Sequence, residues 1–105
     1  MILSFNEMPL DSRIWVYQSD KKIQEQELLE ITTKLIEFLK NWTAHGDDLK
    51  SSFEIKYDRF LIIALNEKST KASGCSIDAC VHFIQKIEKD YSLNLLDKMN
   101  VAFKQ

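Results

Sequence analysis

Two runs of the chain are almost continuously apolar, and they predict the central strands of a sheet. Residues 13–18 and 60–65 are rich in β-branched and aromatic side chains, which is typical of strands covered on both faces. Residues 51–57 alternate strictly between polar and apolar side chains, so they predict a half-exposed edge strand. We expect one more short strand over residues 99–104.

Apolar residues spaced by three and four positions predict two amphipathic helices. The first is expected from about Gln24 to Ala44, with Gly46 as a left-handed stop and a loop over residues 47–50. The second is expected to end near Tyr91. The apolar stripes are Leu28, Ile31, Leu35, Phe38, Leu39 and Trp42 in the first helix and Ile77, Cys80, Val81, Ile84, Ile87 and Tyr91 in the second.

These elements follow one another in the order β-α-β-β-α-β, which is typical of the ferredoxin-like split βαβ plait. In this α+β fold, an antiparallel sheet carries two helices on one face. Right-handed crossovers would place the first and third strands in the middle of the sheet, in agreement with their apolar character. The length of 105 residues fits a single domain over residues 1–105.

Helices cover only one face of such a sheet, yet the first and third strands are apolar on both faces. If Ile14 and Val16 face the helices, Trp15 and Tyr17 face away from them. An apolar patch of several large side chains rarely stays in contact with water. We therefore expect a second subunit, a protein partner or a C-terminal extension over Trp15 and Tyr17, and a dimer or larger species in solution.

Composition and charge indicate which kinds of partner and which cellular compartment to expect. The net charge of −2 gives no global field that would attract nucleic acid or an anionic membrane. The N-terminal residues lack a secretory signal, and no stretch approaches the roughly 20 apolar residues that cross a bilayer. Two cysteines in a chain of this kind are typical of reduced thiols. We expect a cytoplasmic protein that binds neither nucleic acid nor membrane.

The reactive side chains are concentrated where the second helix is expected to begin. Ser76 is a good N-cap, so the first-turn amides would point toward Gly74 and Cys75. Ser73 and Gly74 permit the close approach of a carboxylate or phosphate. The strand directions place the loop of His45 at the same edge. These five residues form the candidate site for a small anion.

Two other interpretations of this stretch stay open. In the simplest, Ser76 caps the helix, Asp78 complements the helix dipole, and nothing is bound. In the other, Cys75 is a nucleophile, because a thiol ahead of a helix N-terminus has a lowered pKa. His45 would then be its base, as in a small cysteine-dependent enzyme. We favour a binding module over an enzyme.

Metal, RNA and nucleotide chemistry are poorly matched by these residues. Cys80 and His82 are two positions apart, about 200° around a helix axis, so they cannot share an ion. Cys80 is expected in the core, and no metal or cofactor is expected. The third strand lacks the glycine and alternating aromatic residues of RNA-recognition domains. No Gly-x-x-x-x-Gly-Lys-Ser/Thr motif is present, so we expect no ATPase.

Four segments together carry a resemblance that spans nearly the whole chain. They are Ser12-Arg13-Ile14-Trp15-Val16-Tyr17-Gln18, Trp42-Thr43-Ala44-His45-Gly46, Ser52-Phe53-Glu54-Ile55 and Ser73-Gly74-Cys75-Ser76-Ile77-Asp78. The chain resembles a family of short uncharacterised bacterial proteins that are often labelled "ABC transporter ATPase". The resemblance implies a bacterial protein, and it implies a C-terminal extension, because family members are longer at that end. It carries over no catalytic residue.

Overall fold

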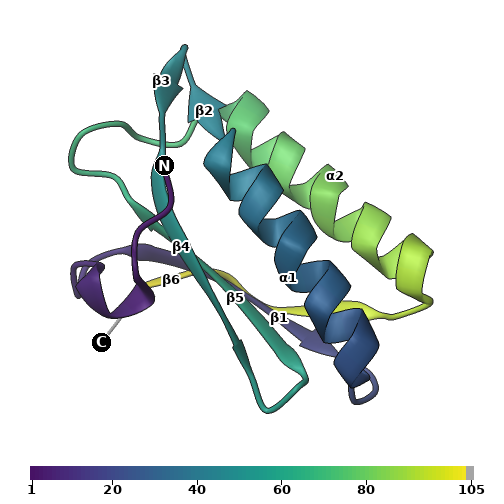
Figure 1. The fold of residues 1–105 in the computed structure, drawn as a ribbon. Coiled ribbons are helices and arrows are strands. Elements are labelled where there is room, and N and C mark those ends of the chain that lie inside the picture. Colours follow the sequence, from purple (N-terminus) through teal and green to yellow (C-terminus); the bar gives the residue numbers. More distant parts are fainter. Residues whose placement is uncertain (104–105) are drawn as a thin grey trace.

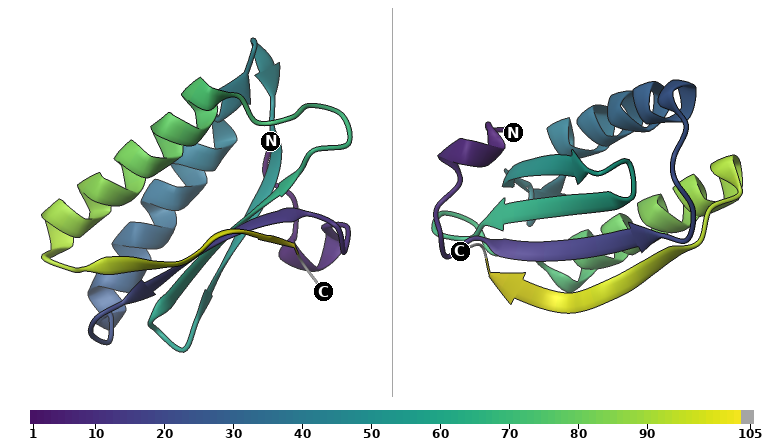
Figure 2. Two further views of the ribbon diagram at one scale, coloured as in Figure 1. Left: turned by 180° about the vertical axis from the view of Figure 1, so that it is seen from behind. Right: turned by 90° about the horizontal axis from the view of Figure 1, so that it is seen from below.

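A computed structural model describes the backbone of residues 1–103 and the side chains of residues 1–95. The chain forms an α+β structure in which two helices lie side by side over one face of an antiparallel sheet (Figures 1 and 2). No helix among the described residues is long and apolar enough to cross a membrane. The elements in chain order are η1 (Phe5–Glu7), β1 (Arg13–Ser19), α1 (Glu25–Lys40), β2 (Thr43–Ala44), β3 (Asp47–Asp48), β4 (Lys50–Lys56), β5 (Phe60–Asn66), α2 (Gly74–Tyr91) and β6 (Leu95–Phe103).

The main sheet has the strand order β4-β5-β1-β6, and all neighbours in it are antiparallel. The two strands predicted to be central, β1 and β5, are central, and the alternating strand β4 is at an edge. The strand predicted over residues 99–104 begins earlier than expected, because β6 spans Leu95–Phe103. Lys104 lies outside the described residues.

The prediction that Trp15 and Tyr17 face away from the helices is wrong. Both side chains are about 5% exposed and belong to the core between the sheet and the helices. Trp15 meets Trp42 edge to face there, with 6.1 Å between ring centroids. Alternation separates the two faces of a strand but cannot say which of two apolar faces meets the helices. The larger side chains fill the wide space under the helices, so Trp15 is shielded without a second copy.

The opposite face of the sheet carries a smaller apolar cluster. Ile14 and Ala64, which pair across β1 and β5, are buried there beneath Met8 from the N-terminal segment. Leu3 and Phe5 pack against the same cluster. The chain ahead of β1 therefore covers part of the face that the sequence led us to leave open.

The first helix ends earlier than predicted. It stops at Lys40, and Thr43 and Ala44 pair with Asp48 and Asp47 as a short β2–β3 hairpin. Gly46 is left-handed, with φ of 82°, but it serves the turn of this hairpin rather than a helix end. Tryptophan and threonine are modest helix formers, so tertiary packing easily ends the helix before them.

Candidate functional site

The start of α2 lies three residues earlier than the sequence led us to expect. The N-cap is Ser73 rather than Ser76, and the two serines form a reciprocal capping box. The Ser76 N–H donates to Ser73 Oγ at 3.1 Å, and the Ser73 N–H donates to Ser76 Oγ at 2.7 Å. Gly74 and Cys75 are therefore residues of the first helical turn, not of the loop ahead of it.

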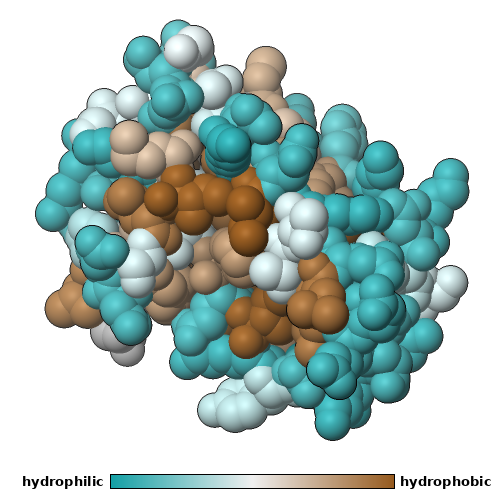
Figure 3. Space-filling view, in the orientation of Figure 1, coloured by the Kyte–Doolittle hydropathy of each residue, from teal (hydrophilic) through white to brown (hydrophobic). Residues whose placement is uncertain are grey.

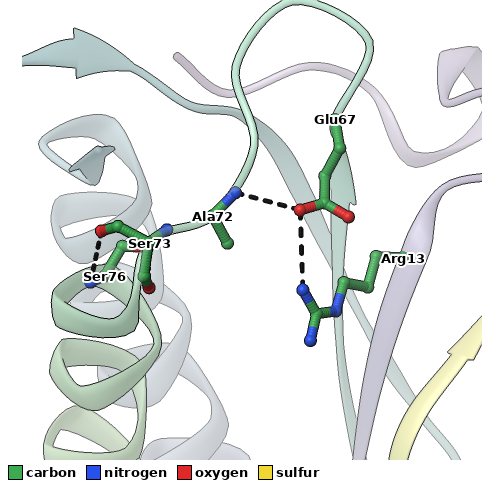
Figure 4. A network of polar contacts seen from close by, with 5 residues as sticks. All are labelled: Arg13, Glu67, Ala72, Ser73 and Ser76. Atoms are coloured by element: carbon green, nitrogen blue, oxygen red, sulfur yellow. Dashed lines mark hydrogen bonds and ion pairs between the residues drawn. The ribbon is translucent and has the colours of Figure 1, made fainter. Parts of the chain in front are cut away.

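The loop that leads into α2 is tied to the sheet through Glu67. One oxygen of its carboxylate accepts the Ala72 N–H at 3.0 Å and lies 3.6 Å from the Arg13 guanidinium on β1 (Figure 4). The Arg13 guanidinium also lies 5.0 Å from the centre of the Trp15 ring, within the range of a cation–π contact. This network fixes where the chain turns from β5 into the helix, just ahead of Ser73.

The β2–β3 hairpin is anchored to the same helical turn by Trp42. Its indole Nε1–H donates to the Ser76 carbonyl oxygen at 2.9 Å, and both residues are buried. The hairpin turn consists of His45 and Gly46, both with positive φ, a conformation that suits a two-residue turn. The packing of Trp42 therefore brings His45 to the beginning of α2.

A cleft of about 500 Å³ lies between the end of α1, the hairpin and the start of α2. Its lining consists of Glu37, Phe38, Asn41, Trp42, Thr43, Ala44, His45, Ser73, Cys75, Ser76 and Ala79. Four of the five candidate residues are thus brought together, as the predicted strand directions required. Gly74 is not in the lining, but nothing lies within 4 Å of the position that a Cβ would occupy there.

The cleft combines several chemically useful groups. Backbone N–H groups of a first helical turn point out of the helix and favour negative charge. Cys75 and His45 are both exposed, so thiol and imidazole are accessible from solvent. The Glu37 carboxylate lies in the same lining and repels a bound anion, so the cleft is better suited to a small anion than to a highly charged one. Small anions and electrophilic molecules are therefore the ligands to which this chemistry is suited.

The two cysteines have different environments. Cys80 is buried in the core, and desolvation raises the pKa of its thiol to about 12. It therefore stays protonated and unreactive at neutral pH, as its place in the predicted apolar stripe indicated. Cys75 is the accessible thiol of the pair. Among residues 1–95, no group of three or more His, Cys, Asp and Glu side chains could hold a metal ion.

Several cleft residues were missed by sequence reasoning. Asn41 and Thr43 line it, but residues 41–44 were predicted to be helical. The available signal for a hairpin was the His45-Gly46 pair, which has a glycine in its second position and follows the β-branched Thr43 by two residues. A second cleft of about 310 Å³ runs between the helices, where Phe38 and Phe83 stack with centroids 4.6 Å apart. It offers mainly apolar surface.

No protein-family model, curated protein sequence or solved structure matches this chain. The geometry of the cleft and the surface of the sheet therefore carry what can be inferred about function.

Proposed function

We propose that the fold is the ferredoxin-like split βαβ plait. The strand order β4-β5-β1-β6 with antiparallel neighbours supports this, because it places the first and third long strands in the middle and the second and fourth at the edges. The β2–β3 hairpin is an addition between α1 and β4. It builds one wall of the cleft at the start of α2.

The function we propose is that of a small binding module, which takes a small anion such as a phosphate or carboxylate in this cleft. The observation that carries the proposal is the cleft itself, which opens at the N-terminal end of an 18-residue helix. Helix N-termini favour anions through their N–H groups and dipole. The first-turn N–H groups of Gly74 and Cys75 would supply the donors, because those of Ser73 and Ser76 are used in the capping box, and His45 would close the opposite side.

The test is a titration with inorganic phosphate followed through backbone amide signals. We expect the Gly74 and Cys75 amides to shift in a saturable way. The first turn of α1, which carries Glu25 and Glu27, is the internal control, because carboxylates there repel anions. Gly74→Pro removes one donor at a helix position that tolerates proline, and it should weaken the shift. Amides of α2 that stay unmoved at saturating phosphate would contradict the proposal.

A second candidate function is a cysteine-dependent enzyme, because Cys75 and His45 line the same cleft and are both exposed. The imidazole would accept the proton of the thiol, and the thiolate would attack an electrophilic carbon and displace its leaving group, which would take up the proton from the imidazolium. The test is the rate at which iodoacetamide alkylates Cys75. A rate well above that of free cysteine, which falls in His45→Ala, would support this function. A rate equal to that of free cysteine in both proteins would contradict it.

We also propose that the protein is bacterial and cytoplasmic, that it hydrolyses no ATP and that it binds neither nucleic acid nor membrane. Cys75 and Cys80 are both free, which supports a reducing compartment. The only glycines are Gly46 and Gly74, so a glycine-rich phosphate loop has no counterpart here. The net charge of −2 supports the absence of nucleic acid.

Self-association is part of the proposed function. The dimer was expected over Trp15 and Tyr17, but these side chains lie under the helices, and the N-terminal segment covers Ile14 on the opposite face. On the open face, Val16 and Ile62 stay half-buried. An open-face dimer would use these two residues.

A further inference from the structure

The outer edge of β4 is only partly used by the chain itself. The Ser51 N–H donates to the Met1 carbonyl at 2.9 Å, and the Ser51 carbonyl accepts the Leu3 N–H at 2.8 Å. Backbone groups of a strand alternate in direction, so those of Phe53 and Ile55 point to the same side. Within the described part of the chain, these outward groups have no backbone partner. The part of the β4 edge at Phe53 and Ile55 can therefore pair with another strand.

The surface beside this edge is apolar. Apolar side chains gather between α1 and the β4 edge in the space-filling view (Figure 3). Phe53 and Ile55 on β4 are only partly buried in the core. On α1, the large aliphatic residues Leu29 and Ile36 are 61% and 43% exposed. An added strand would cover part of this surface while it satisfied the outward backbone groups of Ile55.

The charges on the other face of β4 are arranged to match a second copy of the same strand. Glu54 and Lys56 flank Ile55, and their charged atoms lie 4.0 Å apart in the single chain. If two copies of β4 pair antiparallel about Ile55, Glu54 of each copy stands opposite Lys56 of the other. Opposite charges in directly opposed positions stabilise a pair of strands. The symmetry produces this match twice.

The neighbouring register is disfavoured by the same criteria. Pairing about Phe53 would place Lys50 opposite Lys56 of the second copy, and like charges in opposed positions are destabilising. It would also require the edge at Ser51, which the N-terminal residues already occupy. Pairing about Ile55 avoids both problems.

We propose that two copies of this chain associate by adding β4 to β4, antiparallel and centred on Ile55, to form one continuous sheet. This inference rests on the proposed self-association and specifies its surface. It replaces an open-face dimer by an edge-to-edge dimer, in which the two α1 helices lie on the same side of the joined sheet. A two-fold interface is self-complementary, which is the property that the Glu54–Lys56 arrangement has.

Charge exchange tests this register directly. Sedimentation over a wide range of protein concentration should show a monomer–dimer equilibrium for the wild type. Glu54→Lys alone and Lys56→Glu alone each create two like-charge pairs, and each should raise the dimer Kd roughly tenfold. The double variant restores opposite charges in opposed positions and should return the Kd to within about twofold of the wild type. Asp78→Lys makes the same charge change on α2 and should leave the Kd unaltered.

A second readout needs no variant. The outward N–H of Ile55 should exchange with solvent quickly in dilute protein and several-fold more slowly at high concentration, where the dimer forms. A protein that stays monomeric at all concentrations overturns both self-association and this interface. A dimer that is lost in Ile62→Thr but unaffected by the single charge variants overturns the edge interface and leaves open-face self-association standing. Equal weakening by the single and double variants overturns the register.

Discussion

The two faces of the sheet are covered by different kinds of structure. On one face, α1 and α2 bury Leu61, Ile63 and Leu65 completely. On the other, a short N-terminal segment with one turn of 3-10 helix covers Ile14 and Ala64. The strands contribute apolar residues to both faces, yet only one face receives the two long helices.

As a result, one face of the sheet provides most of the stability, and the other keeps apolar surface that a partner can reach. A helix covers a large apolar area with side chains from every turn, so residues beneath it lose all contact with water. The N-terminal segment reaches one end of its face and one position on the β4 edge, at Ser51. The rest of that edge and the half-buried Val16 and Ile62 stay accessible. The weaker cover thus leaves the surface on which association can take place.

The largest expected effect is a difference in stability loss between two adjacent residues of β5 that face opposite sides of the sheet. Ile63→Ala removes a fully buried side chain beneath the helices, and we expect it to lower the free energy of unfolding by about 2–5 kcal/mol. Ile62→Ala is the matched control on the other face, where the side chain is only half-buried, and should cost about 1 kcal/mol. Urea denaturation monitored by circular dichroism measures both. Equal losses would mean that the two faces are equally well covered.

The N-terminal cover is tested by Met8, which is 3% exposed over Ile14 and Ala64. We expect Met8→Ala to cost about 2 kcal/mol, the lower end of the range for large-to-small core substitutions, because this cluster is small. Leu10→Ala removes a side chain of similar size that is mostly exposed, and it should change the urea midpoint little. If Met8→Ala and Leu10→Ala behaved alike, the N-terminal segment would contribute no cover.

The sequence predicted the parts of this fold that depend on local pattern. The β1 and β5 runs, the alternating β4 strand and the presence of both helices were predicted correctly because their hydrophobic periods are clear, although the first helix ends earlier and the second begins earlier than predicted. The direction of the Trp15 side chain was not predictable, since both faces of β1 are apolar and only tertiary volume decides between them. The cover by Met8 was missed for a similar reason, because residues 1–12 have no period.

The candidate site was predicted in its location but not in its details. Strand directions placed His45 beside the beginning of α2, and the cleft contains both. The exact cap was missed because Ser73 and Ser76 are both good cap residues, and only the observed hydrogen bonds distinguish them. The hairpin was missed because Trp42 fits the apolar stripe of α1 by spacing alone.

The helical cover also differs from the N-terminal cover in how its end is capped. The Ser73 hydroxyl accepts the Ser76 N–H, whereas the Ser4 hydroxyl makes no capping hydrogen bond at the start of η1. We expect Ser73→Ala to lower the free energy of unfolding by about 1 kcal/mol. Ser4→Ala is the matched control and should leave the urea midpoint unchanged. A cost at Ser4 as large as that at Ser73 would contradict this difference between the two covers.

The smallest expected effect is electrostatic and lies where β1 ends and β6 begins. The Asn94 backbone N–H donates to the Asp20 carboxylate at 3.0 Å, and the Asn94 side chain donates to it at 3.1 Å. These bonds favour the charged form, chiefly through the backbone N–H, and hold the pKa of Asp20 below its ordinary value. Because the folded-state pKa is the lower one, the unfolded chain binds the proton more readily.

The contribution of Asp20 to the free energy of unfolding is therefore fully present above the pKa of the unfolded state, and it is lost as pH falls through the folded-state pKa. Asp20→Asn should destabilise the protein slightly at neutral pH, and the difference from the wild type should vanish in acid. Asp11→Asn, which removes an exposed carboxylate ahead of β1, is the control for the loss of one negative charge. Urea midpoints of the three proteins across the acidic range measure this. If the difference in urea midpoint between wild type and Asp20→Asn grew in acid, the Asn94 contact would favour the protonated form of Asp20. That result would contradict the prediction.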